Sequence, residues 1–306
     1  MNRRAVAHAL EYGLFRLLAG SLKLLPDRVG DALGMSLGWL AGVVLRIRRN
    51  DVDTHLRIAF PDKSAEWRAR VARACYLHLG REAAATFRLA GLDAPAIVDS
   101  TEVIGLDAFR EAAEAGHGVV LVTGHVGNWE IGGAAFAARG FPIDVVAKGM
   151  ANRRFEEALN ANRERLGMRV VDMTRAHRQG PRSLRAGRVL GFVADQDARG
   201  GGVFVPFFGR LASTARGPAL FALRSGAPLF VGACLRTPGR GTRYRVTVER
   251  VEAPRTGGLR DDVLELTRSH AAVLQRAVAA APAQYFWHHK RWKTRPPEEL
   301  PPEAPV

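Results

Sequence analysis

The chain has 306 residues, of which 47% are hydrophobic, so it can bury a core and is too apolar to be disordered throughout. Lysine and arginine outnumber aspartate and glutamate by 45 to 30, which gives a formal net charge of +15. This balance favours an anionic partner, such as nucleic acid, an anionic lipid, or an acidic protein or substrate. No basic arm, RNA-binding pattern or zinc-finger pattern supports nucleic acid.

Cys75 and Cys234 both lie in apolar surroundings, which argues against a disulfide framework and favours a cytosolic location for the catalytic part.

The N-terminal part raises the question of membrane attachment. Residues 29–45 carry a single charge, Asp31, and an arginine cluster follows at residues 46–49. The apolar run is shorter than the roughly 20 residues of an unambiguous span, and no signal-peptide cleavage site follows it. We therefore expect residues 1–49 to form a membrane-inserted or interfacial segment with a basic cytoplasmic flank. The alternative is a core helix of a soluble domain.

The same segment contains a misleading motif. Gly34-Met35-Ser36-Leu37-Gly38 matches the nucleophile elbow of serine hydrolases letter for letter. That elbow requires a strand before the serine, and no strand is predicted there. Ser36 is therefore interpreted as a small packing residue.

Residues 50–295 predict an α/β domain. Residues 64–92 have helical apolar spacing, and short β-rich runs then alternate with helical runs. Strands are expected at residues 119–123, 143–147, 169–172, 189–194, 229–234 and 244–248. Helices are expected at residues 106–115, 129–138, 153–166, 216–225 and 261–281. The alternation predicts a mainly parallel sheet flanked by helices, followed by a disordered, proline-rich tail at residues 296–306.

A histidine and a carboxylate follow the first of these strands. The run Gly124-His125-Val126-Gly127-Asn128-Trp129-Glu130 forms a strand-to-helix turn, the position at which open α/β sheets carry reactive groups. The two glycines let the backbone bend so that the two side chains converge. The arrangement suits a histidine base with an acidic partner, the alternative being a structural histidine followed by a capping glutamate. Asn128 is the expected N-cap, and no metal site is predicted, because HExxH and Cys/His clusters are absent from the sequence.

Other candidate residues lie at element ends. Asp195 and Gln196 close the strand at residues 189–194, at the same sheet edge as His125, where they could bind a polar head group or position an arginine. Arg163 lies near the end of a helix, where the helix dipole alone favours a cation, and it could also bind phosphate or offset oxyanion charge. Residues 282–296 interleave aromatic and basic side chains, which suits either nucleic-acid bases or a lipid head-group boundary.

In their order and spacing, these blocks resemble the bacterial lipid A late acyltransferases, the lauroyl/myristoyl acyltransferase family of the wider lysophospholipid acyltransferase-like group. The blocks are residues 124–130, 162–165, 195–197, 207–209, 212–214 and 282–288, with Gly217. The resemblance implies a glycerolipid acyltransferase-like domain on the cytoplasmic face of the inner membrane. It also implies transfer of an acyl chain from acyl carrier protein, or coenzyme A, to a hydroxyl of a lipid acceptor such as a lipid A precursor. The expected partners are thus the thioester donor, the lipid acceptor and an anionic membrane surface, with no cofactor and no nucleic acid.

The resemblance also implies residue roles. His125 is expected to be the general base and Glu130 the partner that orients it, with Asn128, Arg163, Asp195 and Gln196 binding substrate. No acyl-enzyme is required, because the thioester is already activated. Gln196 departs from members that carry histidine there, and the acid at position 130 varies between aspartate and glutamate, so the subgroup stays open. The alternatives are a phosphatidylinositol mannoside or lysophospholipid acyltransferase, a hydrolase, and a non-enzymatic basic protein that binds membranes or nucleic acid.

Overall fold

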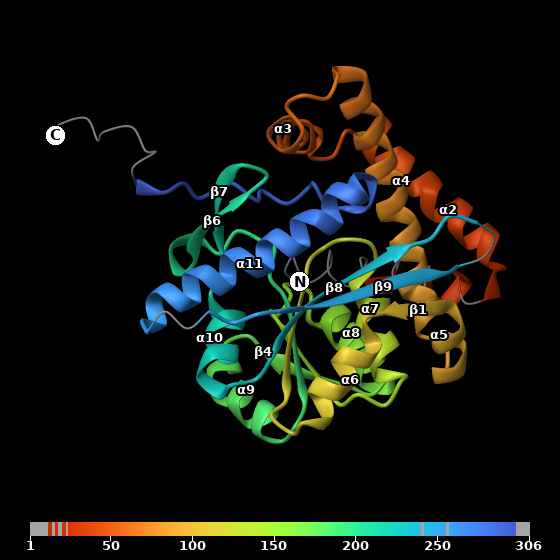
Figure 1. Ribbon diagram of the computed structural model, residues 1–306. Helices are drawn as coiled ribbons and strands as arrows, with labels where there is room; N and C mark the ends of the chain where they lie inside the picture. Colours follow the sequence, from red (N-terminus) through yellow and green to blue (C-terminus); the bar gives the residue numbers. More distant parts are fainter. Residues whose placement is uncertain are drawn as a thin grey trace, which may run out of the picture.

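A seven-stranded sheet forms the centre of the protein (Figure 1). The computed structural model describes residues 12–13, 16–17, 20–22, 24–239, 242–254 and 257–297. The strands of the sheet are β1 Thr101–Ile104, β2 Val119–Thr123, β3 Ile143–Ala147, β4 Met168–Asp172, β5 Val189–Val193, β8 Leu229–Arg236 and β9 Tyr244–Val251. Their spatial order is β1-β9-β8-β2-β5-β3-β4, and all neighbours are parallel except β8 and β9. The predicted mainly parallel sheet is confirmed.

Helices cover both faces of this sheet. The helices of the described residues are α2 Asp27–Trp39, α3 Arg49–Ala59, α4 Ala65–Leu89, α5 Ala94–Ser100, α6 Leu106–Glu114, α7 Trp129–Ala137, α8 Arg153–Arg165, α9 Ala176–Arg185, α10 Gly217–Ser225 and α11 Leu259–Ala280. Of these, α2 and α3 pack on α4 rather than on the sheet. A π-helical turn, η1, spans Leu40–Val44 between α2 and α3. Because side chains alternate along β2, Val120 and Val122 pack into the core that α10 and α11 share, whereas Val119 and Leu121 pack into the core of α6 and α7. Both faces of β2 are therefore buried, and its carboxyl end is fixed in position.

Six strands and α-helices lie outside the sequence prediction. They are β1, helices α3, α5 and α9, and a hairpin of β6 Val203–Phe207 and β7 Arg210–Thr214. Helix α9 contains Gly180 and Pro181, so its composition does not favour a helix. Its amphipathic packing against β5 and α10 stabilises it instead. Phe207 of the hairpin is buried in the core.

Close packing of α2 on α4 explains the false nucleophile elbow. A Cβ added to Gly38 would lie 2.1 Å from the carbonyl oxygen of Tyr76, and one added to Gly34 would lie 2.4 Å from that of Gly80. The glycines of the motif therefore let two helix backbones approach each other. Ser36 lies between them, inside α2, with its side chain exposed and its hydroxyl donating to Ala32 O at 2.8 Å. It is neither a nucleophile nor, contrary to the expectation, a packing residue.

The structure bears on the N-terminal expectation only in part. In the described ranges, no helix taken alone has the length and apolar character to cross a membrane. The segments Asp27–Val44 and Arg49–Ala59 meet that test only as a pair, and they are bent by 90° relative to each other. Of the tail expected to be disordered, residues 298–306 lie outside the described residues.

Candidate active site

His125 lies just beyond the carboxyl end of β2, in a loop held on two sides. The amide of Phe286 donates to His125 O at 2.9 Å, and the amide of Gly127 donates to Gln284 O at 2.8 Å. Gly127 has φ +61°, and an added Cβ would lie 1.8 Å from the Cys234 carbonyl oxygen, so only glycine fits there. The histidine backbone is therefore fixed before any substrate binds.

The acidic partner of His125 is Asp195. The His125 Nδ1 atom lies 2.6 Å from Asp195 Oδ1, and the His125 backbone amide donates to Oδ2 at 2.8 Å. Asp195 follows β5, which pairs with β2, so neighbouring strand ends bring the two residues together across 70 positions of sequence. The carboxylate thereby fixes both the ring and the backbone of the histidine.

The imidazole of His125 and the carboxylate of Asp195 each favour the charged form of the other. Burial disfavours the charged form of His125, but the charge and hydrogen bond of Asp195, with a contribution from Glu130, raise its pKa above the usual 6.5. Burial likewise opposes ionisation of Asp195, yet His125 lowers the pKa of that carboxyl to about 2. Asp195 is therefore ionised at neutral pH and accepts the Nδ1 proton. This tautomer leaves Nε2 of His125 able to accept a proton.

Glu130 does not make the contact expected of it. It lies in the first turn of α7 and pairs with Arg163 of α8, with Nε–Oε2 and Nη2–Oε1 distances of 3.0 and 2.5 Å. The fork of the guanidinium matches both carboxylate oxygens, which fixes Glu130 toward α8. The expectation that Glu130 orients His125 is thus corrected: Asp195 makes that contact, and Glu130 acts on the ring only through its charge.

Asn128 and Gln196 both follow the histidine in sequence and differ in environment. Asn128 is buried and caps α7, its Oδ1 accepting from the Ile131 amide at 3.0 Å, as predicted. Its Nδ2 donates to Glu82 at 3.0 Å, so both ends of the amide are occupied by protein groups. Gln196 is exposed, and its Nε2 lies 3.2 Å from Nε2 of His125, at the position of the acceptor proton in a general-base reaction.

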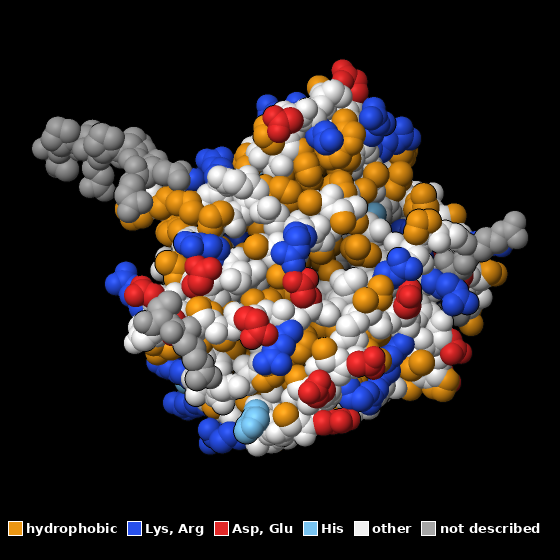
Figure 2. Space-filling model, in the orientation of Figure 1, with side chains coloured by type: hydrophobic (Ala, Val, Ile, Leu, Met, Phe, Trp, Pro, Cys, Tyr) orange, Lys and Arg blue, Asp and Glu red, His pale blue; other side chains and the backbone are white. Residues whose placement is uncertain are grey.

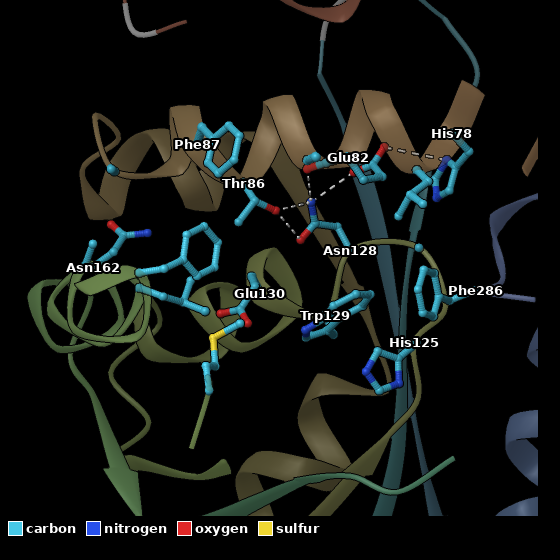
Figure 3. A pocket seen from close by; sticks show the side chains of 18 of the residues that line it. His78, Glu82, Thr86, Phe87, His125, Asn128, Trp129, Glu130, Asn162 and Phe286 are labelled. Atoms are coloured by element: carbon cyan, nitrogen blue, oxygen red, sulfur yellow. Dashed lines mark hydrogen bonds and ion pairs between the residues drawn. The ribbon is translucent and has the colours of Figure 1, made fainter. Parts of the chain in front are cut away.

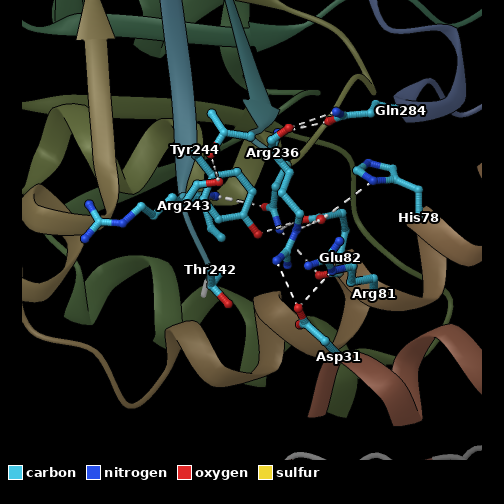
Figure 4. A network of polar contacts seen from close by, with 12 residues as sticks. Asp31, His78, Arg81, Glu82, Arg236, Thr242, Arg243, Tyr244 and Gln284 are labelled. Atoms are coloured by element: carbon cyan, nitrogen blue, oxygen red, sulfur yellow. Dashed lines mark hydrogen bonds and ion pairs between the residues drawn. The ribbon is translucent and has the colours of Figure 1, made fainter. Parts of the chain in front are cut away.

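A buried polar network that the sequence did not predict supports this loop (Figure 4). Glu82 of α4 accepts from Arg236 Nε at 2.5 Å, in addition to its bond with Asn128. Asp31 of α2 accepts from Arg236 Nη1 at 3.1 Å and from Arg88 Nη2 at 2.8 Å. These buried carboxylates and guanidinium groups must pair with one another, because leaving one of them unpaired would strongly destabilise the fold. The only signal in the sequence was Asp31, a lone charge within an apolar run.

An apolar cavity of about 650 Å³ adjoins the histidine. It runs beneath α4, from His125 and Phe286 at one end toward Phe87 and Asn162 at the other (Figure 3). Its apolar walls come from three helices and the C-terminal segment: Leu79, Ala83, Phe87 and Ala90 of α4, Trp129 of α7, Phe155, Ala158 and Leu159 of α8, and Phe286. An elongated apolar space ending at a general base accommodates a hydrocarbon chain whose reactive end meets the base.

The aromatic and basic C-terminal run is mainly interior. Tyr285, Trp287, Arg291 and Trp292 are buried, and Arg291 donates to the carbonyl oxygen of Ser213 at 2.7 Å. The expectation of a surface run for bases or lipid head groups is therefore corrected for these residues. The run packs over the catalytic loop, because burying large aromatic rings stabilises the fold more than exposing them would.

The remaining sequence expectations concern cysteine and metal chemistry. Both cysteines are free and buried, which agrees with the prediction of no disulfide. Within the described ranges, no three His, Cys, Asp or Glu side chains are grouped as a metal ion would require.

Comparison with known proteins identifies the family. Residues 4–294 match the model of the bacterial lipid A biosynthesis acyltransferases. The chain is 28% identical over 276 residues to the lipid A biosynthesis lauroyltransferase of Escherichia coli K12, covering 89% of this chain and 88% of that protein. It is 26% identical over 274 residues to the palmitoleoyltransferase of the same organism, covering 89% and 87%. It is 29% identical over 227 residues to the phosphatidylinositol mannoside acyltransferase of Mycolicibacterium smegmatis, covering 73% and 71%. Because the family match spans nearly the whole chain, the protein belongs to the bacterial lipid A biosynthesis acyltransferase family and is an acyltransferase.

Proposed function

We propose that the protein transfers a fatty acyl chain from a thioester to a hydroxyl of a membrane lipid, with His125 as general base and Asp195 as its partner. The observation that carries this proposal is the His125–Asp195 hydrogen bond of 2.6 Å beside an apolar cavity of about 650 Å³. A family acyltransferase needs a base for the acceptor hydroxyl and an apolar site for the acyl chain. The two features lie next to each other here.

The reaction follows from this geometry. Nε2 of His125 takes the proton of the acceptor hydroxyl while the hydroxyl oxygen attacks the thioester carbonyl. Asp195 stabilises the imidazolium through the Nδ1 hydrogen bond. When the tetrahedral intermediate collapses, the carbon–sulfur bond breaks, an ester remains on the lipid, and the imidazolium returns the proton to the thiolate. We assign Arg163 to the charge of the developing oxyanion and Gln196 to the incoming hydroxyl.

The donor and acceptor are assigned from charge and from the relatives. The net charge of +15 suits the acidic surface of acyl carrier protein, which we propose as donor ahead of coenzyme A. A lipid A precursor is the proposed acceptor because the family match spans residues 4–294. The likeness to a phosphatidylinositol mannoside acyltransferase makes such a mannoside the alternative acceptor. A lipid acceptor implies that the protein acts at a membrane, for which we propose the cytoplasmic face of the inner membrane.

The activity is expected to depend on pH through His125. Because the base must be neutral to accept a proton and its pKa is raised by Asp195, kcat/KM should fall as pH drops through a pKa above 6.5. The measurement is the pH profile of kcat/KM, which reports the ionisation of the free enzyme. An acidic limb well below pH 6.5 would contradict the assignment of His125.

Glu130 and Arg163 are expected to act as a unit. Alanine at either position should lower kcat by about 10²-fold, because each residue fixes the other and Glu130 lines the cavity. The double variant should be no worse than the more damaged single variant, since coupled residues are not additive. Initial rates and thermal unfolding of all four proteins measure this. Additive losses would show that the two residues act separately.

The acceptor is tested by mass spectrometry of lipids from a strain that lacks the gene. The proposal predicts that one lipid class lacks a single acyl chain, and that the wild-type protein restores it while His125→Ala does not. Lipid profiles unchanged by deletion and by complementation would refute the proposed function.

A further inference from the structure

Large apolar side chains gather on the outside of one part of the protein. Ten of the fourteen exposed large hydrophobic residues in the described ranges lie between Leu17 and Ile47. Seven of them surround the turn between α2 and α3: Leu37, Trp39, Leu40, Val43, Val44, Leu45 and Ile47. Soluble proteins rarely expose a contiguous apolar patch of this kind without an interaction partner. The apolar face therefore needs an occupant.

Arginines border the same turn. Arg46, Arg48, Arg49 and Arg73 line a surface hollow of about 900 Å³, together with Val43 of the apolar face. At the end of the molecule where α2, α3 and α4 lie, basic side chains stand beside hydrophobic ones (Figure 2). Cationic and apolar groups thus share one surface, built from both sides of the bend between α2 and α3.

Charge in the hollow is only partly neutralised. Asp53 pairs with Arg49 at 3.0 Å, and Asp51 lies 3.4 Å from Lys290 outside the hollow. The side chains of Arg46 and Arg73 form no hydrogen bond or ion pair with any described residue. Two guanidinium groups are therefore free to bind an anion, and the fork of a guanidinium matches phosphate oxygens.

The neighbouring apolar side chains decide between the possible anionic partners. A single-stranded nucleic acid would need several stacking platforms, and Trp39 is the only aromatic residue among the seven exposed hydrophobic residues of this surface; a duplex would offer phosphates but no hydrocarbon for the six aliphatic ones. An anionic bilayer presents phosphates at the level of the head groups and hydrocarbon directly beneath them. It complements both halves of this surface at once.

We propose that residues 37–49, together with Arg73, form a docking surface for an anionic phospholipid bilayer, with the apolar side chains in the head-group boundary and a lipid phosphate in the arginine hollow. The chain bends by 90° between Asp27–Val44 and Arg49–Ala59, so the apolar and the basic side chains of this surface lie around one turn. The inference extends the membrane association proposed above, but lipid binding is measured without turnover. A failure of acyl transfer therefore leaves it untouched.

The test uses the full-length chain and sedimentation with two kinds of vesicle: pure phosphatidylcholine, and equal parts of phosphatidylcholine and phosphatidylglycerol. Arg46→Ala/Arg73→Ala should reduce partitioning onto the anionic vesicles by about 25-fold, at about fivefold per charge near the surface. The matched control, Arg178→Ala/Arg182→Ala on the exposed face of α9, removes the same charge and should change partitioning less than about threefold.

A second variant tests the apolar half of the surface. Leu40→Ser/Val44→Ser should weaken partitioning onto both kinds of vesicle, whereas the arginine variant loses only the preference for anionic lipid. Thermal unfolding confirms that each variant is folded. Equal losses in the α9 control and the Arg46/Arg73 variant would overturn the proposal, because net charge alone would then explain binding. Wild-type partitioning by both test variants would also overturn it.

Discussion

Replacing His125 with alanine is expected to lower kcat for acyl transfer by about 10³-fold, because general-base catalysis contributes roughly 10²–10⁴. The ring is largely buried, and its Nδ1 and Nε2 atoms contact Asp195 and Gln196. No other described histidine forms a hydrogen bond with Asp195, so no neighbour replaces the lost base. Initial rates of acylated-lipid formation measure the effect.

The control for His125→Ala is a measurement of whether the variant protein is still folded. His125→Ala should keep the melting temperature within a few degrees and retain wild-type partitioning onto vesicles, because the docking surface lies on other elements. A folded variant with wild-type kcat would exclude His125 as the base. The same loss in an unfolded sample would be uninformative, so Asp195 supplies an independent test.

Asp195→Asn is expected to lower kcat by about 10³-fold while the site keeps its shape. The asparagine amide would donate to Nδ1, which forces the proton onto Nε2 and leaves the ring unable to accept one. Loss of the carboxylate also removes the charge that raises the pKa of His125, so residual activity should have its acidic limb at lower pH. The pH profile separates this role from a purely structural one.

Asp197→Asn is the matched control for this substitution. Asp197 lies two residues away, and its carboxylate accepts from the Thr294 hydroxyl at 2.9 Å and does not contact His125. Its variant should stay within about fivefold of the wild-type kcat, as expected for a substitution away from the reacting atoms. Equal losses in the two asparagine variants, or an unshifted pH profile in Asp195→Asn, would contradict the pairing with His125.

The sequence predicted where the reactive residues lie but not how they pair. Apolar runs and turn residues located β2 and β5, and the rule for strand ends placed His125 and Asp195 at one sheet edge. Which carboxylate turns toward the imidazole depends on side-chain packing. Glu130 is closer in sequence, yet the guanidinium of Arg163 on α8 fixes it elsewhere. That competition involves residues 33 positions apart and leaves no local pattern.

The second limit of the sequence prediction was that it did not show which charged and aromatic residues are buried. A single charge in residues 29–45 is consistent with a membrane segment, but Asp31 pairs with Arg88 and Arg236 inside the protein. The C-terminal aromatic residues looked like a surface run because basic residues separate them, and Arg291 proves to be buried with them. Composition cannot distinguish a satisfied buried arginine from an exposed one, since the partners come from distant segments of the chain.

Product analysis with purified protein tests the proposed acyl transfer most directly. Acyl carrier protein thioester and a lipid acceptor are incubated with the protein, and released thiol, free fatty acid and acylated lipid are quantified together. Transfer by the His125–Asp195 pair predicts one acylated lipid for each thiol released, with little free fatty acid. Fatty acid released in step with thiol and no acylated lipid would identify a hydrolase and contradict the proposed reaction.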